Sequence, residues 1–110
     1  MKGTSDRGYL YLFPCILYLP AKDWGLRDQL RRAAVSIPLN IAEGYGHYRV
    51  ADFKRFLTIA NASAYEIHSQ VQLAGRLGYV GALETEMIVK NSEEISRMLV
   101  GLRKRVERQV

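Results

Sequence analysis

The sequence predicts an all-α protein, an antiparallel up-down-up-down four-helix bundle whose first helix is short and irregular. Apolar residues recur in alternating steps of three and four over long segments, which is the spacing of helices with one buried face. The connections between these segments are about two to five residues long, so consecutive helices should run antiparallel. A chain of 110 residues is sufficient for one domain with a single core.

The first part of the chain is predicted to be irregular. Residues 1–8 are polar and should be disordered, and residues 9–110 should form the single domain. Residues 9–19, YLYLFPCILYL, are apolar but too few to span a bilayer, which needs about 20. Basic residues precede this run, as in a secretory signal, but the run contains Pro14 and lacks a small-x-small cleavage pattern. We expect a short helix, or an extended segment, buried against the next helix.

Residues 26–46 are predicted to form the helix around which the others pack. One apolar face consists of Leu26, Leu30, Ala33, Ala34, Ile37, Ile41 and Tyr45. A second apolar edge consists of Val35, Leu39 and Ala42. Pro38 should kink this helix because proline has no backbone N–H to donate. Gly44 and Gly46 should end it, because glycine adopts left-handed backbone angles without penalty.

Two further helices are predicted over residues 49–77 and 82–108. The first has an apolar stripe that consists of Phe53, Leu57, Ala60, Ala64, Ile67, Val71 and Ala74. This regularity indicates packing against nearly parallel or antiparallel neighbours, and Gly78 is placed to stop the helix. The main seam of the last helix is expected at Ile88, Asn91, Ile95, Met98 and Leu102.

Two stretches of the chain carry a family resemblance. QLRRAAVSIPLNIAEGYG (residues 29–46) and DFKRFLTIANASAYEIHSQVQLAGRLGYV (residues 52–80) resemble the four-helix-bundle proteins encoded in intervening sequences of 23S rRNA genes. The accessory variability determinant proteins of diversity-generating retroelements are a related group. The resemblance implies a bundle that assembles as a homopentamer, with no known enzymatic activity. The retroelement relatives bind nucleic acid and a reverse transcriptase, which makes both of these candidate partners of this protein, whereas the rRNA-encoded proteins have no settled role. The short first segment departs from the family, whose first helix is long and amphipathic.

Antiparallel packing should gather basic residues at one end of the bundle, because the start of the second long helix then lies beside the end of the last one. The residues expected there are Arg49, Lys54, Arg55, Arg103, Lys104, Arg105 and Arg108, together with Tyr45, His47 and Tyr48. Asp52 and Glu107 are the acids expected among them. Cations beside rings that can stack on unpaired bases are typical of a sequence-tolerant surface for RNA or DNA, and the net charge of +5 agrees. The alternative is a solvated basic end that complements the helix dipole.

Self-association is the second expectation. The short first element should leave the edge with Ile41 and Tyr45 uncovered in a monomer, and such patches normally mark interfaces. Arg27, Arg31 and Arg32 lie toward the opposite end, where we interpret them as ion-pairing and interface residues. The number five comes from the resemblance alone.

No catalytic or metal-binding motif is recognisable. His47 and His68 lack a second ligand at metal-site spacing, and the lone Cys15 lies in an apolar run and fits a reducing cytoplasm. We therefore expect no enzyme, no cofactor, no metal and no membrane segment. Two hypotheses stay open. One is a cytoplasmic oligomer that binds RNA or DNA, as an accessory factor to a reverse transcriptase or another nucleic-acid enzyme. The other is a structural or protein-interaction module without nucleic-acid binding.

Overall fold

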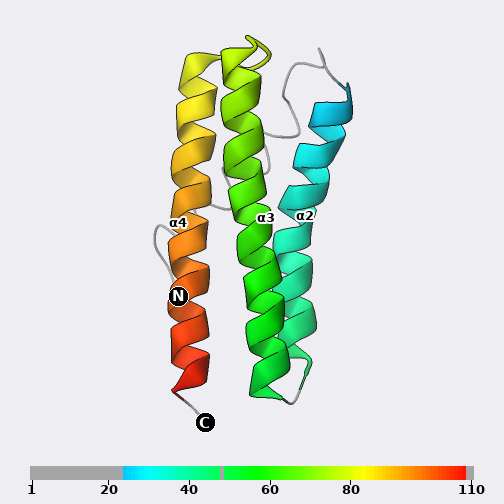
Figure 1. The fold of residues 1–110 in the computed structure, drawn as a ribbon, viewed down its shortest axis with the longest axis vertical. Helices are drawn as coiled ribbons and strands as arrows, with labels where there is room; N and C mark the ends of the chain where they lie inside the picture. Colours follow the sequence, from blue (N-terminus) through cyan, green and yellow to red (C-terminus); the bar gives the residue numbers. More distant parts are fainter. Residues whose placement is uncertain (1–23, 48, 109–110) are drawn as a thin grey trace.

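The computed structural model describes residues 24–47 and 49–108, and these residues form three helices and no strand (Figure 1). The helices are α2 (Trp24–Tyr45), α3 (Val50–Arg76) and α4 (Ala82–Glu107). The all-α prediction is confirmed, and the predicted helix bounds agree with the observed ones to within two residues. The predicted disordered start and the predicted first helix lie outside the described residues. A four-helix bundle is therefore not confirmed: three helices are seen.

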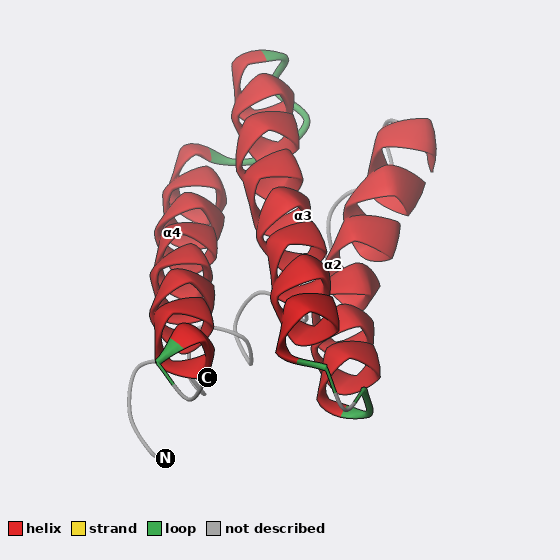
Figure 2. Ribbon diagram, turned by 60° about the horizontal axis from the view of Figure 1, so that its bottom comes forward, coloured by secondary structure: helices red, strands yellow, loops and turns green. Residues whose placement is uncertain are grey.

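The central helix of the described residues is α3. Both α2 and α4 pack along it, and α3 lies between them (Figures 1 and 2). Consecutive helices run antiparallel, so α2 and α4 end where α3 begins, at the lower end of Figure 1. The sequence predicts α2 as the helix around which the others pack, but α3 takes that position in the structure. This is the contact pattern of three successive helices in an up-and-down bundle, where the second of the three lies between the others.

The core is built on the stripe of α3, as its spacing predicts. Its buried members are Leu57, Ala60, Ala64, Ile67, Val71 and Ala74. The residues that other segments contribute are Leu30, Ala33, Ala34 and Ile37 from α2, Val80 from the turn, and Ile88, Ile95, Leu99 and Val106 from α4. Alanines occupy the middle of both α2 and α3, so these two backbones can approach each other closely.

The buried seam of α4 differs from the predicted one. Ile88 and Ile95 are buried as expected, but Ser92 and Leu99 take the intervening positions, and Met98 is 37% exposed. Steps of three and four can be taken in either order after Ile88. Apolarity does not separate the two orders, because each contains one polar residue (Asn91 or Ser92) and one large apolar residue (Met98 or Leu99). Ser92 is buried at low cost because its hydroxyl donates to the Val89 carbonyl, 2.9 Å away.

The glycines that close the helices act in two different ways. Gly78, after α3, has a φ of +78°, the left-handed conformation that the sequence predicts there. Gly44 and Gly46 do not, so the expectation that left-handed angles end α2 was wrong. Gly44 is buried, and a Cβ placed on it would lie 2.8 Å from Cδ1 of Phe53 and 2.9 Å from Cβ of Phe56. The missing side chain therefore lets the end of α2 lie against the start of α3.

Candidate nucleic-acid interface

The structure brings together two basic segments that are far apart in the sequence. Nζ of Lys54, near the start of α3, and Nε of Arg103, near the end of α4, each lie 3.5 Å from the same Oε1 atom of Glu107. The end of α2 lies at the same end of the molecule (Figure 1). We call this region the basic end and define it by Arg49, Lys54, Arg55, Arg103, Lys104, Arg105 and Arg108.

Three carboxylates partly neutralise the basic end. Besides Glu107, Asp52 lies 3.9 Å from Arg55 and 3.7 Å from Nδ1 of His47, and Glu43 lies 3.6 Å from Nε2 of His47. Glu43 was not among the acids predicted for this end, although its position four residues before His47 on the last turn of α2 is a usable signal. Seven cations against three carboxylates leave a clear positive excess.

Four cations of the basic end are exposed and make no ion pair within the described part of the chain. They are Arg49, Lys104, Arg105 and Arg108. Their charges are thus available to an anionic partner. Because contacts to phosphate carry no sequence information, this arrangement suits sequence-tolerant binding.

The aromatic residues of this end are supported by two phenylalanines. The Tyr45 ring is 79% exposed and packs edge-on against Phe53, with ring centroids 6.2 Å apart. The His47 ring lies 5.1 Å from the ring of Phe56, which also carries the Arg55 guanidinium at 4.6 Å. Tyr45 therefore presents the most accessible ring for a base. Neither phenylalanine was predicted at this end, and Phe53 was expected in the apolar stripe of α3. The predicted site residue Tyr48 lies outside the described residues.

A groove of about 200 Å³ runs between α3 and α4 next to these ion pairs. Its lining residues are Leu57, Thr58, Asn61, Leu99, Val100, Arg103, Lys104 and Glu107. Asn61 Oδ1 accepts a hydrogen bond from Ser96 at 2.5 Å, which joins the two helices behind the groove. This groove was not predicted from the sequence, because it depends on the relative rotation of α3 and α4.

The predicted interface residues are spread over α2. Arg31 and Arg32 line an apolar groove of about 420 Å³ on the outer face of α2. Exposed apolar residues of this groove are Val35 and Leu39. Neither arginine makes an ion pair with another described residue. Arg27 is half-buried.

The sequence predicts an uncovered edge that contains Ile41 and Tyr45, and the position of Ile41 corrects this prediction. Ile41 is half-buried and packs against the core, because the helical phase of α2 turns it inward together with Ile37. Tyr45 is exposed, but at the basic end. The exposed apolar edge of α2 is instead formed by Val35 and Leu39, the second edge recognised in the sequence.

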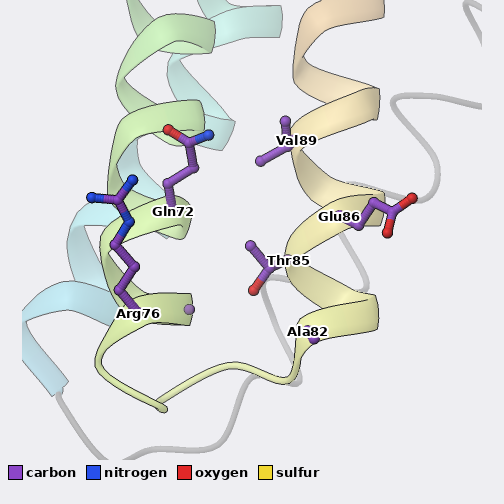
Figure 3. A pocket seen from close by; sticks show the side chains of 7 residues that line it. Gln72, Arg76, Ala82, Thr85, Glu86 and Val89 are labelled. Carbon is purple, nitrogen blue, oxygen red and sulfur yellow. The ribbon is translucent and has the colours of Figure 1, made fainter.

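A second groove of about 420 Å³ lies at the opposite end of the α3–α4 pair (Figure 3). Thr85 and Val89 point from α4 toward α3, whereas Glu86 points away, and its carboxylate lies 3.2 Å from Lys90. Among the described residues that line it, Arg76 is the single cation. Over residues 24–47 and 49–108, no group of three or more histidine, cysteine or acidic residues could hold a metal ion. None of the helices described is long and apolar enough to cross a bilayer.

The fold and the charge distribution define a small helical-bundle protein with one strongly basic end. The chain matches the 23S rRNA-intervening sequence protein family over residues 12–101, and it belongs to this family. Its fold is similar to the crystal structure of a protein of unknown function from the S23 ribosomal protein family of Bacteroides thetaiotaomicron, with a TM-score of 0.80 and 26% sequence identity. That match covers 93% of this chain and 99% of the other. No curated protein matches the chain.

Proposed function

We propose that the protein is a non-enzymatic, cytoplasmic homo-oligomer that binds RNA or DNA through its basic end. The observation that carries this proposal is the pair of contacts from Lys54 and Arg103 to Glu107. These contacts place the start of α3 beside the end of α4, so cations from both helices face one region. The exposed ring of Tyr45 at the same end adds a surface on which an unpaired base can stack.

The exposed edge of α2 supports self-association. Val35 and Leu39 are 39% and 62% exposed, and the arginines beside them make no ion pair among the residues described. Covering this edge with a second copy removes apolar surface from water. The resemblance to proteins encoded in rRNA intervening sequences supports a pentamer, and several basic ends in one assembly would strengthen weak contacts through multivalency.

The same resemblance extends the proposal to a partner. The accessory variability determinant proteins of diversity-generating retroelements bind a reverse transcriptase as well as nucleic acid. A relation to that group would make this protein an accessory factor that recruits a reverse transcriptase, or another nucleic-acid enzyme, to its template. In a pull-down, such an enzyme is expected together with nucleic acid.

A structural or protein-interaction module without nucleic-acid binding is the second candidate. The exposed apolar edge of α2 favours it, because that edge fits a protein partner as well as a second copy. Under this function the basic end is merely solvated. A pull-down should then capture a protein partner that stays bound after nuclease treatment.

The test is salt-dependent binding of labelled single-stranded RNA and DNA oligonucleotides, followed by fluorescence anisotropy. The variant Arg103→Gln/Lys104→Gln/Arg105→Gln should bind more weakly, and the slope of log K against log salt should fall by about 0.7 for each phosphate that the variant no longer neutralises. The matched control Arg76→Gln/Lys90→Gln/Arg97→Gln removes three exposed cations outside the basic end and should keep most of the affinity. Absent or salt-insensitive binding by the unmodified protein, or an equal loss of affinity in both variants, would contradict the proposal.

A further inference from the structure

The acidic residue Glu107 holds a central position within the basic end. One of its carboxylate oxygens contacts cations from two helices, Lys54 of α3 and Arg103 of α4, both at 3.5 Å. We infer that the groove between α3 and α4 is a subsite for one phosphate group of the bound nucleic acid, and that Glu107 occupies the place of that phosphate in the unbound protein. This inference rests on the proposed function.

The groups around Glu107 suit a phosphodiester oxygen. Arg103 contacts Glu107 through Nε and makes no ion pair with any other described residue. Lys104 lines the same groove and makes no ion pair within the described ranges. The Asn61 amide nitrogen, also in the lining, donates no hydrogen bond to any described residue. These nitrogens can donate to an anion with several acceptor oxygens, which a phosphate has and a single carboxylate oxygen does not.

The contacts of Glu107 are weak enough to be displaced. At 3.5 Å they are longer than the 2.7–2.9 Å typical of charge-assisted hydrogen bonds. The three side chains are 34% to 46% exposed, so water screens their attraction. The dipole at the end of α4 opposes a bound anion, whereas the nearby start of α3 favours it. The cations, more than the helix ends, must therefore provide the attraction.

A different role for Glu107 predicts the opposite result. If its carboxylate mainly joins α3 to α4, removing the charge should loosen the two helices and weaken nucleic-acid binding. If the carboxylate competes with phosphate, removing the charge should strengthen binding. The sign of the change thus separates the two roles.

The experiment compares Glu107→Gln with Glu86→Gln by anisotropy of labelled single-stranded RNA and DNA oligonucleotides. Both variants raise the net charge equally and lie on α4, but Glu86 pairs with Lys90 away from the basic end. Glu107→Gln should bind about three- to tenfold more tightly than the unmodified protein, whereas Glu86→Gln should change affinity less than about twofold. In the background Lys54→Gln/Arg103→Gln, the gain from Glu107→Gln should disappear.

Three outcomes would overturn the inference: an unchanged affinity of Glu107→Gln, a weaker one, or a gain that Glu86→Gln matches. If the unmodified protein binds with normal salt dependence in these cases, the proposed function stands without the subsite. If neither the unmodified protein nor Glu107→Gln binds at any salt concentration, both the proposed function and the inference fail. Circular dichroism and molar mass in solution confirm that each variant retains its fold and assembly.

Discussion

At the scale of single residues, Gly44 determines how closely α2 and α3 can meet at the basic end. It is buried where the end of α2 passes the first turns of α3, and the space for a Cβ is taken by Phe53 and Phe56. The Phe56 atom involved is itself a Cβ, which cannot move away without its backbone. The absence of a side chain at Gly44 therefore leaves room for Phe53 and Phe56, whose rings contact Tyr45 and His47.

The first prediction compares two glycines in helices. Gly44→Ala should destabilise the protein by about 1–2 kcal/mol, because overpacking costs about 1–3 kcal/mol and the better helix propensity of alanine offsets part of it. Gly101→Ala is the control: a Cβ added to Gly101 on α4 would meet no atom within 4 Å. It should stabilise by about 0.5–1 kcal/mol. Urea unfolding at one fixed protein concentration measures both, and a stabilised Gly44→Ala variant would contradict the packing described.

Sequence reasoning placed Gly44 at the end of a helix but assigned it the wrong cause. A glycine that provides a turn and a glycine that permits a close approach look the same in a sequence; the neighbour that needs the space is far along the chain. The same limit applies to Glu107. It was recognised as an acid among cations, but its bridging of Lys54 and Arg103 depends on the relative rotation of two helices.

At the scale of helices, the rotation of α4 about its axis determines which residues face α3. Leu99 is 3% exposed and its neighbour Met98 is 37% exposed. The helix is therefore rotated so that Leu99, and not Met98, faces the core. Ser92, about two turns earlier, is buried on the same side as Leu99. The rotation that buries Leu99 also brings Arg103, one turn later, to the groove beside α3.

The second prediction tests this rotation. Leu99→Ala should cost about 2–5 kcal/mol of unfolding free energy, the usual range for a leucine truncated in a core. Met98→Ala should cost less than about 1 kcal/mol, because much of its side chain is already in water. Chemical denaturation of both variants provides the comparison. Equal costs, or a larger cost for Met98→Ala, would support the seam expected from the sequence instead.

The three described helices were not equally predictable. In α3 every step of the apolar stripe agrees with one helical phase, and its six predicted members from Leu57 to Ala74 are buried. In α4 two phases are compatible with the sequence, and the choice depends on a serine that satisfies its hydroxyl within its own helix. Periodicity thus identifies a helix, whereas its rotation is determined by packing.

At the scale of the whole molecule, the two proposed surfaces lie on different parts of the fold. The basic end combines α3 with α4, whereas the apolar edge with Val35 and Leu39 is on the outer face of α2, and α3 lies between α2 and α4 (Figure 1). Self-association through α2 would therefore leave the α3–α4 groove open. An assembly of this kind can carry several accessible basic ends, and its affinity then depends on how many of them contact one nucleic-acid strand at the same time.

The third prediction separates assembly from binding. The assembly should have a molar mass that is a multiple of 12.5 kDa, and the resemblance implies five copies. Val35→Glu/Leu39→Glu should reduce the molar mass in solution to the 12.5 kDa of one chain, because a charge buried in an apolar contact is costly. The helical content should not change, since both side chains are already partly exposed. Leu83→Glu/Met98→Glu, with similar exposure on α4, is the matched control and should remain assembled. Light scattering after size exclusion measures all three proteins.

The same variants test whether assembly matters for nucleic acid. The separated chain keeps every cation of its basic end, so each single contact with phosphate is unchanged. It can no longer place several basic ends on one strand at the same time, and its affinity for a long single strand should fall at least about tenfold. For an oligonucleotide too short to reach two ends, the assembled and separated proteins should bind alike. A monomer that binds the long strand as tightly as the assembly would show that one basic end is sufficient. If the unmodified protein is already monomeric, the proposed interface on α2 is contradicted.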